Sequence, residues 1–98
     1  MNVRVLPVDA PGAAAEAADV LRAGGLVVLP TDTVYGVSAA IDEAAIDRIF
    51  AAKQRPPERA VPVLLADPDS AHLVTREFSA EAQRLSEAFW PGPLTIVV

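Results

Sequence analysis

The stretch from Leu26 to Ala39, LVVLPTDTVYGVSA, begins as a continuous apolar run and then turns polar. The run Leu26–Leu29 stands between glycine and proline, which is typical of a strand buried on both faces of an α/β sheet. Thr31, Thr33 and Tyr35 follow it, and open α/β sheets bind ligands beyond the carboxyl ends of their strands. Two interpretations remain open: an ordinary strand exit, in which Thr and Asp cap the next turn and Tyr35 packs on the core, or one wall of a binding site.

Helix and strand patterns alternate on both sides of this stretch. Alanines and a leucine at helical spacing in residues 14–21 precede Gly24-Gly25, a common helix stop. A second helix begins after Asp42, a preferred cap, and must end near the double proline at 56–57. The other expected elements are strands at 3–6, 61–66 and 94–98, a helical turn at 69–74, and a helix after Ser79 with Ala82, Leu85 and Phe89 facing inward.

This alternation predicts an α/β fold, with a twisted mixed or parallel sheet and helices packed on it. The final stretch LTIVV, at 94–98, is strongly strand-like and no turn follows it. We therefore expect an incomplete domain, with residues 1–98 forming the N-terminal part of a single larger domain.

Composition limits the class of protein. The chain has 98 residues, of which 52% are hydrophobic, enough for one core. Because it has no cysteine, a disulfide framework, a thiolate zinc site and a cysteine nucleophile are excluded within it. No apolar run reaches the length of a signal peptide or the ~20 residues of a membrane span. These features predict a cytoplasmic protein with no membrane partner.

The charge distribution indicates a local site for anions. The formal net charge of −5 argues against non-specific nucleic-acid binding. However, Arg48, Lys53, Arg55 and Arg59 fall within twelve positions. An extended segment would aim Lys53 and Arg55 to one side, and a lysine point charge beside an arginine fork suits phosphate oxygens. The alternative is a solvated helix end, where cations also favour the helix dipole.

Familiar nucleotide and metal motifs are absent from the sequence. Neither GxxxxGK[ST] nor GxGxxG occurs, and the single histidine, His72, fits a surface helix position better than a metal site. Asp42, Asp67 and Asp69 stand at expected turns and caps, where aspartate serves the backbone. We expect no metal held by protein ligands.

Four motifs taken together resemble the YrdC/Sua5 family of L-threonylcarbamoyladenylate synthases. They are PTDTVYGV (30–37), KQRP (53–56), VPVLL (61–65) and FWPGPLTIVV (89–98), in the order and spacing of that family. The resemblance implies the DHBP-synthase-like α/β architecture around a positively lined cavity. Ala-Val at 60–61 and VYGV depart mildly from the usual family residues, and the family's later Ser-x-Asn motif does not occur in these 98 residues.

The resemblance also implies an activity. Family members condense L-threonine, bicarbonate and ATP to threonylcarbamoyl-AMP and pyrophosphate, and the product feeds the N6-threonylcarbamoyl modification of tRNA. Fixed cations, with Mg²⁺ carried by the nucleotide, offset the repulsion between these anions. The implied residues are Thr33, Tyr35 and Thr31 for L-threonine, Lys53, Arg55 and Arg59 for the nucleotide, and Lys53 and Arg55 for catalysis.

Two alternative functions remain open. The first is a module that binds double-stranded RNA or tRNA. The basic cluster at 48–59 favours this function, and the net charge of −5 argues against it. The second is the related domain of hydrogenase maturation carbamoyltransferases, whose neighbours are rich in cysteine, whereas this chain has none. For the synthase, the partners expected downstream are the proteins that transfer the threonylcarbamoyl group to tRNA.

Overall fold

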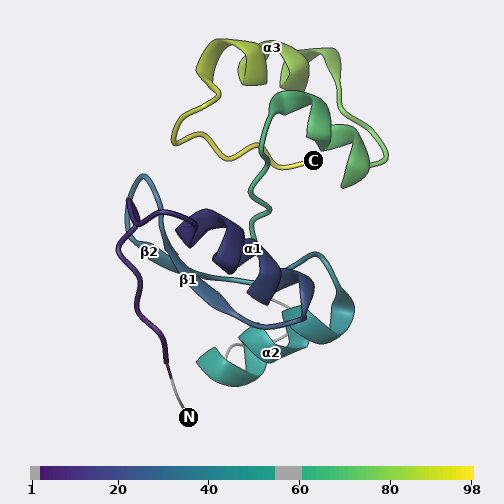
Figure 1. Ribbon diagram of the computed structural model, residues 1–98. Helices are drawn as coiled ribbons and strands as arrows, with labels where there is room; N and C mark the ends of the chain where they lie inside the picture. The colour runs from purple at the N-terminus through teal and green to yellow at the C-terminus, as the bar shows by residue number, and fades with distance from the viewer. Residues whose placement is uncertain (1–2, 55–60) are drawn as a thin grey trace. The chain divides into compact units, whose positions relative to one another are not determined.

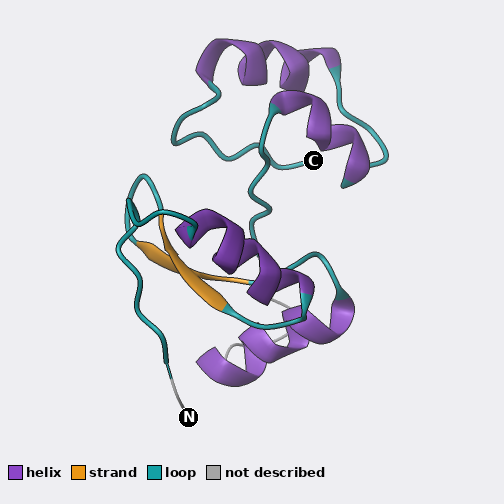
Figure 2. Ribbon diagram, in the orientation of Figure 1, coloured by secondary structure: helices purple, strands orange, loops and turns teal. Residues whose placement is uncertain are grey.

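The computed structural model describes residues 3–54 and 61–98, in two compact units (Figure 1). The first unit spans Met1–Arg59 and holds two helices and a hairpin, and the second spans Ala60–Val98 and is helical in its described part (Figure 2). That both units belong to one domain stays a prediction. No helix in the described part of the chain has the length and apolar character needed to cross a membrane.

Helix α1 (Ala13–Arg22) has the small-residue spacing expected of residues 14–21. It ends at the predicted glycine pair, where Gly24 takes a φ of 85° and the N–H of Gly25 donates to the carbonyl of Val20 at 2.9 Å. A left-handed residue followed by a bond back into the last turn is the usual glycine stop. The predicted helix and its stop are therefore confirmed.

The sheet of the first unit is an antiparallel hairpin. Strand β1 (Val27–Pro30) pairs with β2 (Tyr35–Ser38), and α1 contacts β1 (Figure 2). The strand after Gly25 was predicted, but its burial on both faces is wrong: exposure alternates along β1, and Val28 is 60% exposed. β1 has one strand neighbour among the described residues, so one of its edges is unpaired there. Sequence analysis missed β2, which is short and contains a glycine.

Helix α2 (Glu43–Lys53) begins at the predicted cap. The carboxylate of Asp42 accepts the N–H of Ala45 at 3.1 Å, satisfying one of the free donors of the first turn. Ala45 and Ile49 are its buried residues, as the apolar stripe indicated. The helix ends where Gln54 turns left-handed, with a φ of 53°.

The second unit contains a 3₁₀ helix, η1 (Pro68–Leu73), and helix α3 (Ala80–Phe89). Asp67 caps η1 by accepting the N–H of Ser70 at 3.0 Å. Ser79 caps α3, its hydroxyl accepting a backbone N–H at 3.1 Å. Both helical elements and both caps were predicted from the sequence.

The buried face of α3 differs from the prediction. Ala82 is buried as expected, but Leu85 and Phe89 are 42% and 57% exposed. Ser86 is buried in their place, and its hydroxyl donates to the carbonyl of Gln83 at 2.8 Å, so burial leaves no unpaired donor. Only small side chains are covered here, because the described part of this unit has no sheet for large side chains to contact.

The strands expected at 3–6, 61–66 and 94–98 are not formed. Val5 and Val97 are 87% and 92% exposed. A strand needs a neighbour for its backbone N–H and C=O groups, and no described residue pairs with these stretches. These stretches have the composition of strands, but the described residues contain no strand that pairs with them.

Candidate functional site

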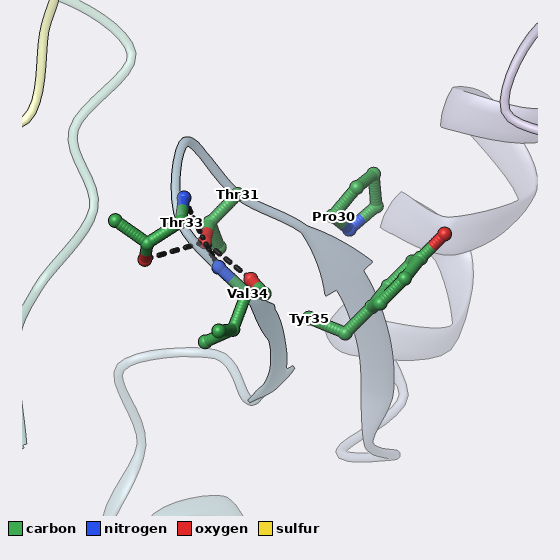
Figure 3. A pocket seen from close by; sticks show the side chains of 5 residues that line it. All are labelled: Pro30, Thr31, Thr33, Val34 and Tyr35. Atoms are coloured by element: carbon green, nitrogen blue, oxygen red, sulfur yellow. Dashed lines mark hydrogen bonds between the residues drawn. The ribbon is translucent and has the colours of Figure 1, made fainter.

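The loop of the hairpin forms a small hollow of about 230 Å³ on the surface of the first unit. Figure 3 shows the five residues that line it, Pro30, Thr31, Thr33, Val34 and Tyr35. Three of the five carry hydroxyl groups, and these are the three that the family resemblance assigned to L-threonine. The structure therefore brings them to one place, although whether they bind a ligand stays a prediction.

Thr31 organises the loop. Its Oγ1 accepts the backbone N–H of Val34 at 3.2 Å and that of Thr33 at 3.3 Å, and it donates to the carbonyl oxygen of Val34 (Figure 3). A hydroxyl has one hydrogen and two lone pairs, so this group is fully used by the turn. The side chain of a threonine commonly bonds nearby backbone in this way, and the strand-exit interpretation, in which threonine caps the turn, is confirmed for Thr31.

Thr33 and Tyr35 are the more available hydroxyls. Thr33 Oγ1 lies 3.4 Å from Thr31 Oγ1, a long contact, and the phenol of Tyr35 forms no hydrogen bond to the described residues. Tyr35 is 76% exposed, so the interpretation that packs it on the core is wrong. The two side chains extend to opposite sides of the loop (Figure 3). A ligand touching both must therefore lie across the turn.

The predicted nucleotide side is only partly described. Lys53 is exposed at the last position of α2, and Gln54 after it is left-handed, so the extended segment expected to carry Lys53 is wrong at these two residues. Arg55 and Arg59 lie outside the described residues, so the convergence of Lys53 with Arg55 stays a prediction. Within residues 3–54 and 61–98, no cluster of three or more histidine or acidic side chains is arranged to hold a metal ion.

One contact in this unit was not predicted at all. Arg48, on α2, donates a hydrogen bond from Nη1 to the carbonyl oxygen of Gly24 in the turn between α1 and β1. The two residues are 24 positions apart, and neither composition nor helical spacing indicates such a pair. Sequence analysis counted Arg48 only as one member of the basic cluster.

Most of the chain is similar to a known protein family. Residues 19–98 match the family model Sua5_yciO_yrdC, described as "Telomere recombination". The threonylcarbamoyl-AMP synthase of Pyrococcus abyssi is 45% identical over 83 residues, which are 84% of this chain and 24% of that protein. A putative threonylcarbamoyl-AMP synthase of Mycobacterium leprae is 41% identical over 85 residues, 86% of this chain and 39% of the relative. The chain thus spans about a quarter to two fifths of these relatives.

A solved structure agrees with the architecture. The crystal structure of P. abyssi Sua5 complexed with L-threonine superposes with a TM-score of 0.75 and 42% sequence identity, over 79% of this chain and 23% of that one. This likeness confirms the predicted α/β class and YrdC-like architecture, of which the described hairpin and helices are a part.

Proposed function

The chain belongs to the Sua5/YciO/YrdC family, and we propose that the protein is a threonylcarbamoyl-AMP synthase, or the part of one that carries the L-threonine side of the site. The observation that carries this proposal is the 42% identity to a structure holding L-threonine, together with the hydroxyl-lined hollow in the PTDTVYG loop. The substrates would be L-threonine, bicarbonate and ATP, and the products threonylcarbamoyl-AMP and pyrophosphate. A cytoplasmic location would provide both ATP and the tRNA that the product serves.

The amino-acid side of the proposed site is the hairpin loop. L-Threonine presents an ammonium, a carboxylate and a hydroxyl, and hydroxyl side chains can donate to the carboxylate and accept from the other two groups. Thr33 and Tyr35 supply such groups from an exposed position. Thr31 belongs to the same side of the site and acts on the shape of the loop.

The nucleotide side is proposed at Lys53, Arg55 and Arg59. The amine of threonine and bicarbonate first give a carbamate with loss of water. A carbamate oxygen then attacks the α-phosphorus of ATP, and the bond to the β-phosphate oxygen breaks to release pyrophosphate. Negative charge gathers on the phosphates throughout, and fixed cations stabilise it. Mg²⁺ is proposed to arrive with the ATP phosphates.

The test measures pyrophosphate release by the protein with each substrate omitted in turn. Release should need both L-threonine and bicarbonate, and Lys53→Ala should lower it by about 10²–10³-fold, as for the loss of one charge-stabilising group. Arg22→Ala is the matched control, since Arg22 is an exposed cation of the same unit paired with Asp19. Unchanged turnover in Lys53→Ala would remove the role given to Lys53, and release without threonine would remove the proposed activity.

Binding of tRNA or double-stranded RNA is the second candidate. It is supported by the cluster of Arg48, Lys53, Arg55 and Arg59 and opposed by the net charge of −5. Electrostatic RNA binding weakens steeply as salt rises from low to physiological concentration. A titration with tRNA at two salt concentrations decides the matter, because an affinity that does not change with salt contradicts this candidate.

If the protein is the synthase, its expected partners are the proteins that take up threonylcarbamoyl-AMP and transfer the threonylcarbamoyl group to tRNA.

A further inference from the structure

Arg48 joins the two parts of the first unit that carry the proposed site. It lies on α2, the helix whose last residue is Lys53. Its guanidinium donates to the carbonyl oxygen of Gly24, in the turn that leads from α1 into β1. Strand β1 in turn leads directly into Thr31 and the hydroxyl-lined loop. Arg48 thus ties the helix that ends at Lys53 to the turn before the strand that leads into the loop.

The carbonyl of Gly24 is a favourable partner for a cation. The negative end of a helix dipole lies at its C-terminus and favours a cation nearby. Gly24 lies just beyond α1 in the left-handed conformation. A guanidinium hydrogen bond at this position is charge-assisted, and so stronger than a neutral one.

The contact also depends on the glycine. A Cβ added at Gly24 would lie 3.3 Å from Arg48 Nη1, tighter than ordinary van der Waals contact.

Arg48 takes part in no ion pair among the described residues. The ion pairs there join Arg4 with Glu16 and Arg22 with Asp19. Among the described residues, the recorded polar contact of Arg48 is therefore with backbone.

Helix α2 packs through an apolar stripe in which Ala45 and Ile49 are buried and Ile46 and Phe50 are half-buried. Apolar packing is not directional. The bond from Arg48 adds one direction-specific contact between the helix and the α1–β1 turn. We propose that Arg48 is a positioning residue, which ties α2 to the α1–β1 turn and sets the place of Lys53 relative to the threonine loop. This inference rests on the proposed function.

The kinetic test compares Arg48→Met, which keeps the length of the side chain and loses its donors, with Arg48→Lys, which keeps a charged donor. Because Lys53 serves the phosphates and the Arg48 bond is exposed to water, Arg48→Met should raise KM for ATP about two- to fivefold, the worth of one exposed charged contact, and leave KM for L-threonine unchanged. Arg48→Lys should recover most of the difference, and Arg22→Met should behave as the wild type. A merely structural loss would lower the fraction of active protein, and with it the apparent kcat, leaving both KM values unchanged. That pattern would overturn the proposal.

A second measurement separates this inference from the proposed function. NMR exchange of the guanidinium protons should be slow for Arg48, which is held by Gly24, and fast for exposed Arg22. If the wild-type protein releases pyrophosphate but the two arginines exchange equally fast, the positioning role alone fails. If Arg48 exchanges slowly but the wild-type protein has no synthase activity, the proposed function fails and the kinetic role of Arg48 fails with it.

Discussion

Replacing Thr31 by valine removes a hydroxyl and keeps the shape of the side chain. The change deletes the two bonds that Oγ1 accepts, from Thr33 and Val34, and the one that it donates to Val34, while the backbone bond from the Thr31 N–H to the Val34 carbonyl remains at 3.2 Å. A hydrogen bond contributes about 0.5–1.5 kcal/mol net, and the low end applies here because water reaches the exposed loop. The loss of all three should destabilise the closed loop by about 1–2 kcal/mol, a factor of roughly 5–30 in its opening equilibrium.

Amide hydrogen exchange measures that opening directly. In Thr31→Val, exchange at Val34 and Thr33 should speed up by roughly 5- to 30-fold. Thr31→Ser keeps the hydroxyl and should stay near the wild type. Thr33→Val is the matched control, since the Thr33 hydroxyl has only a 3.4 Å contact to lose. Equal exchange at Val34 in the wild type and in Thr31→Val would refute the reasoning that this hydroxyl organises the loop.

The remaining predictions concern the phenol of the loop and a helix cap. Tyr35→Phe should leave the free energy of unfolding unchanged, because the exposed phenol forms no hydrogen bond to the described residues. The same change should raise KM for L-threonine several-fold. An unchanged KM would remove Tyr35 from the site. Ser79→Ala deletes the cap of α3 and should cost about 1 kcal/mol in urea unfolding, whereas Ser70→Ala, which keeps the N–H that Asp67 accepts, should cost less. Equal costs would contradict the capping role.

The features predicted correctly from the sequence are local ones. Asp42, Asp67 and Ser79 cap their helices, and Gly24 stops α1, because each acts on backbone within a few residues of itself. Such signals require no knowledge of the rest of the chain.

The features that sequence analysis missed depend on partners distant in the chain. The stretches at 3–6 and 94–98 have strand-like composition, but a strand forms only beside another, and the described residues provide no neighbour. Phe89 was expected inward by helical spacing, yet spacing cannot say what lies opposite, and it is 57% exposed. The antiparallel β2 was missed because YGVS is too short to give a periodic signal.

In the candidate site too, relations between sequence neighbours were predicted and relations between distant residues were not. Its three hydroxyl residues were found together because they are neighbours in sequence, on one loop. The turn-capping role of Thr31 was one of the two interpretations of the sequence, because it acts on neighbouring backbone. The bond from Arg48 to Gly24 was not predicted, because 24 residues separate the two. Lys53 was expected in an extended segment after the helix, but it is the last residue of α2 and Gln54 is left-handed; its relation to Arg55 stays a prediction.

The most direct measurement is the mass of the product formed when the protein is incubated with ATP, bicarbonate and L-threonine. Isotope-labelled bicarbonate and labelled threonine should both enter one adenylate, with one pyrophosphate released for each molecule formed. Omission of any of the three substrates should abolish it. An adenylate that contains neither label, or pyrophosphate release that continues without threonine, would contradict the proposal that this chain provides the threonine side of a threonylcarbamoyl-AMP synthase.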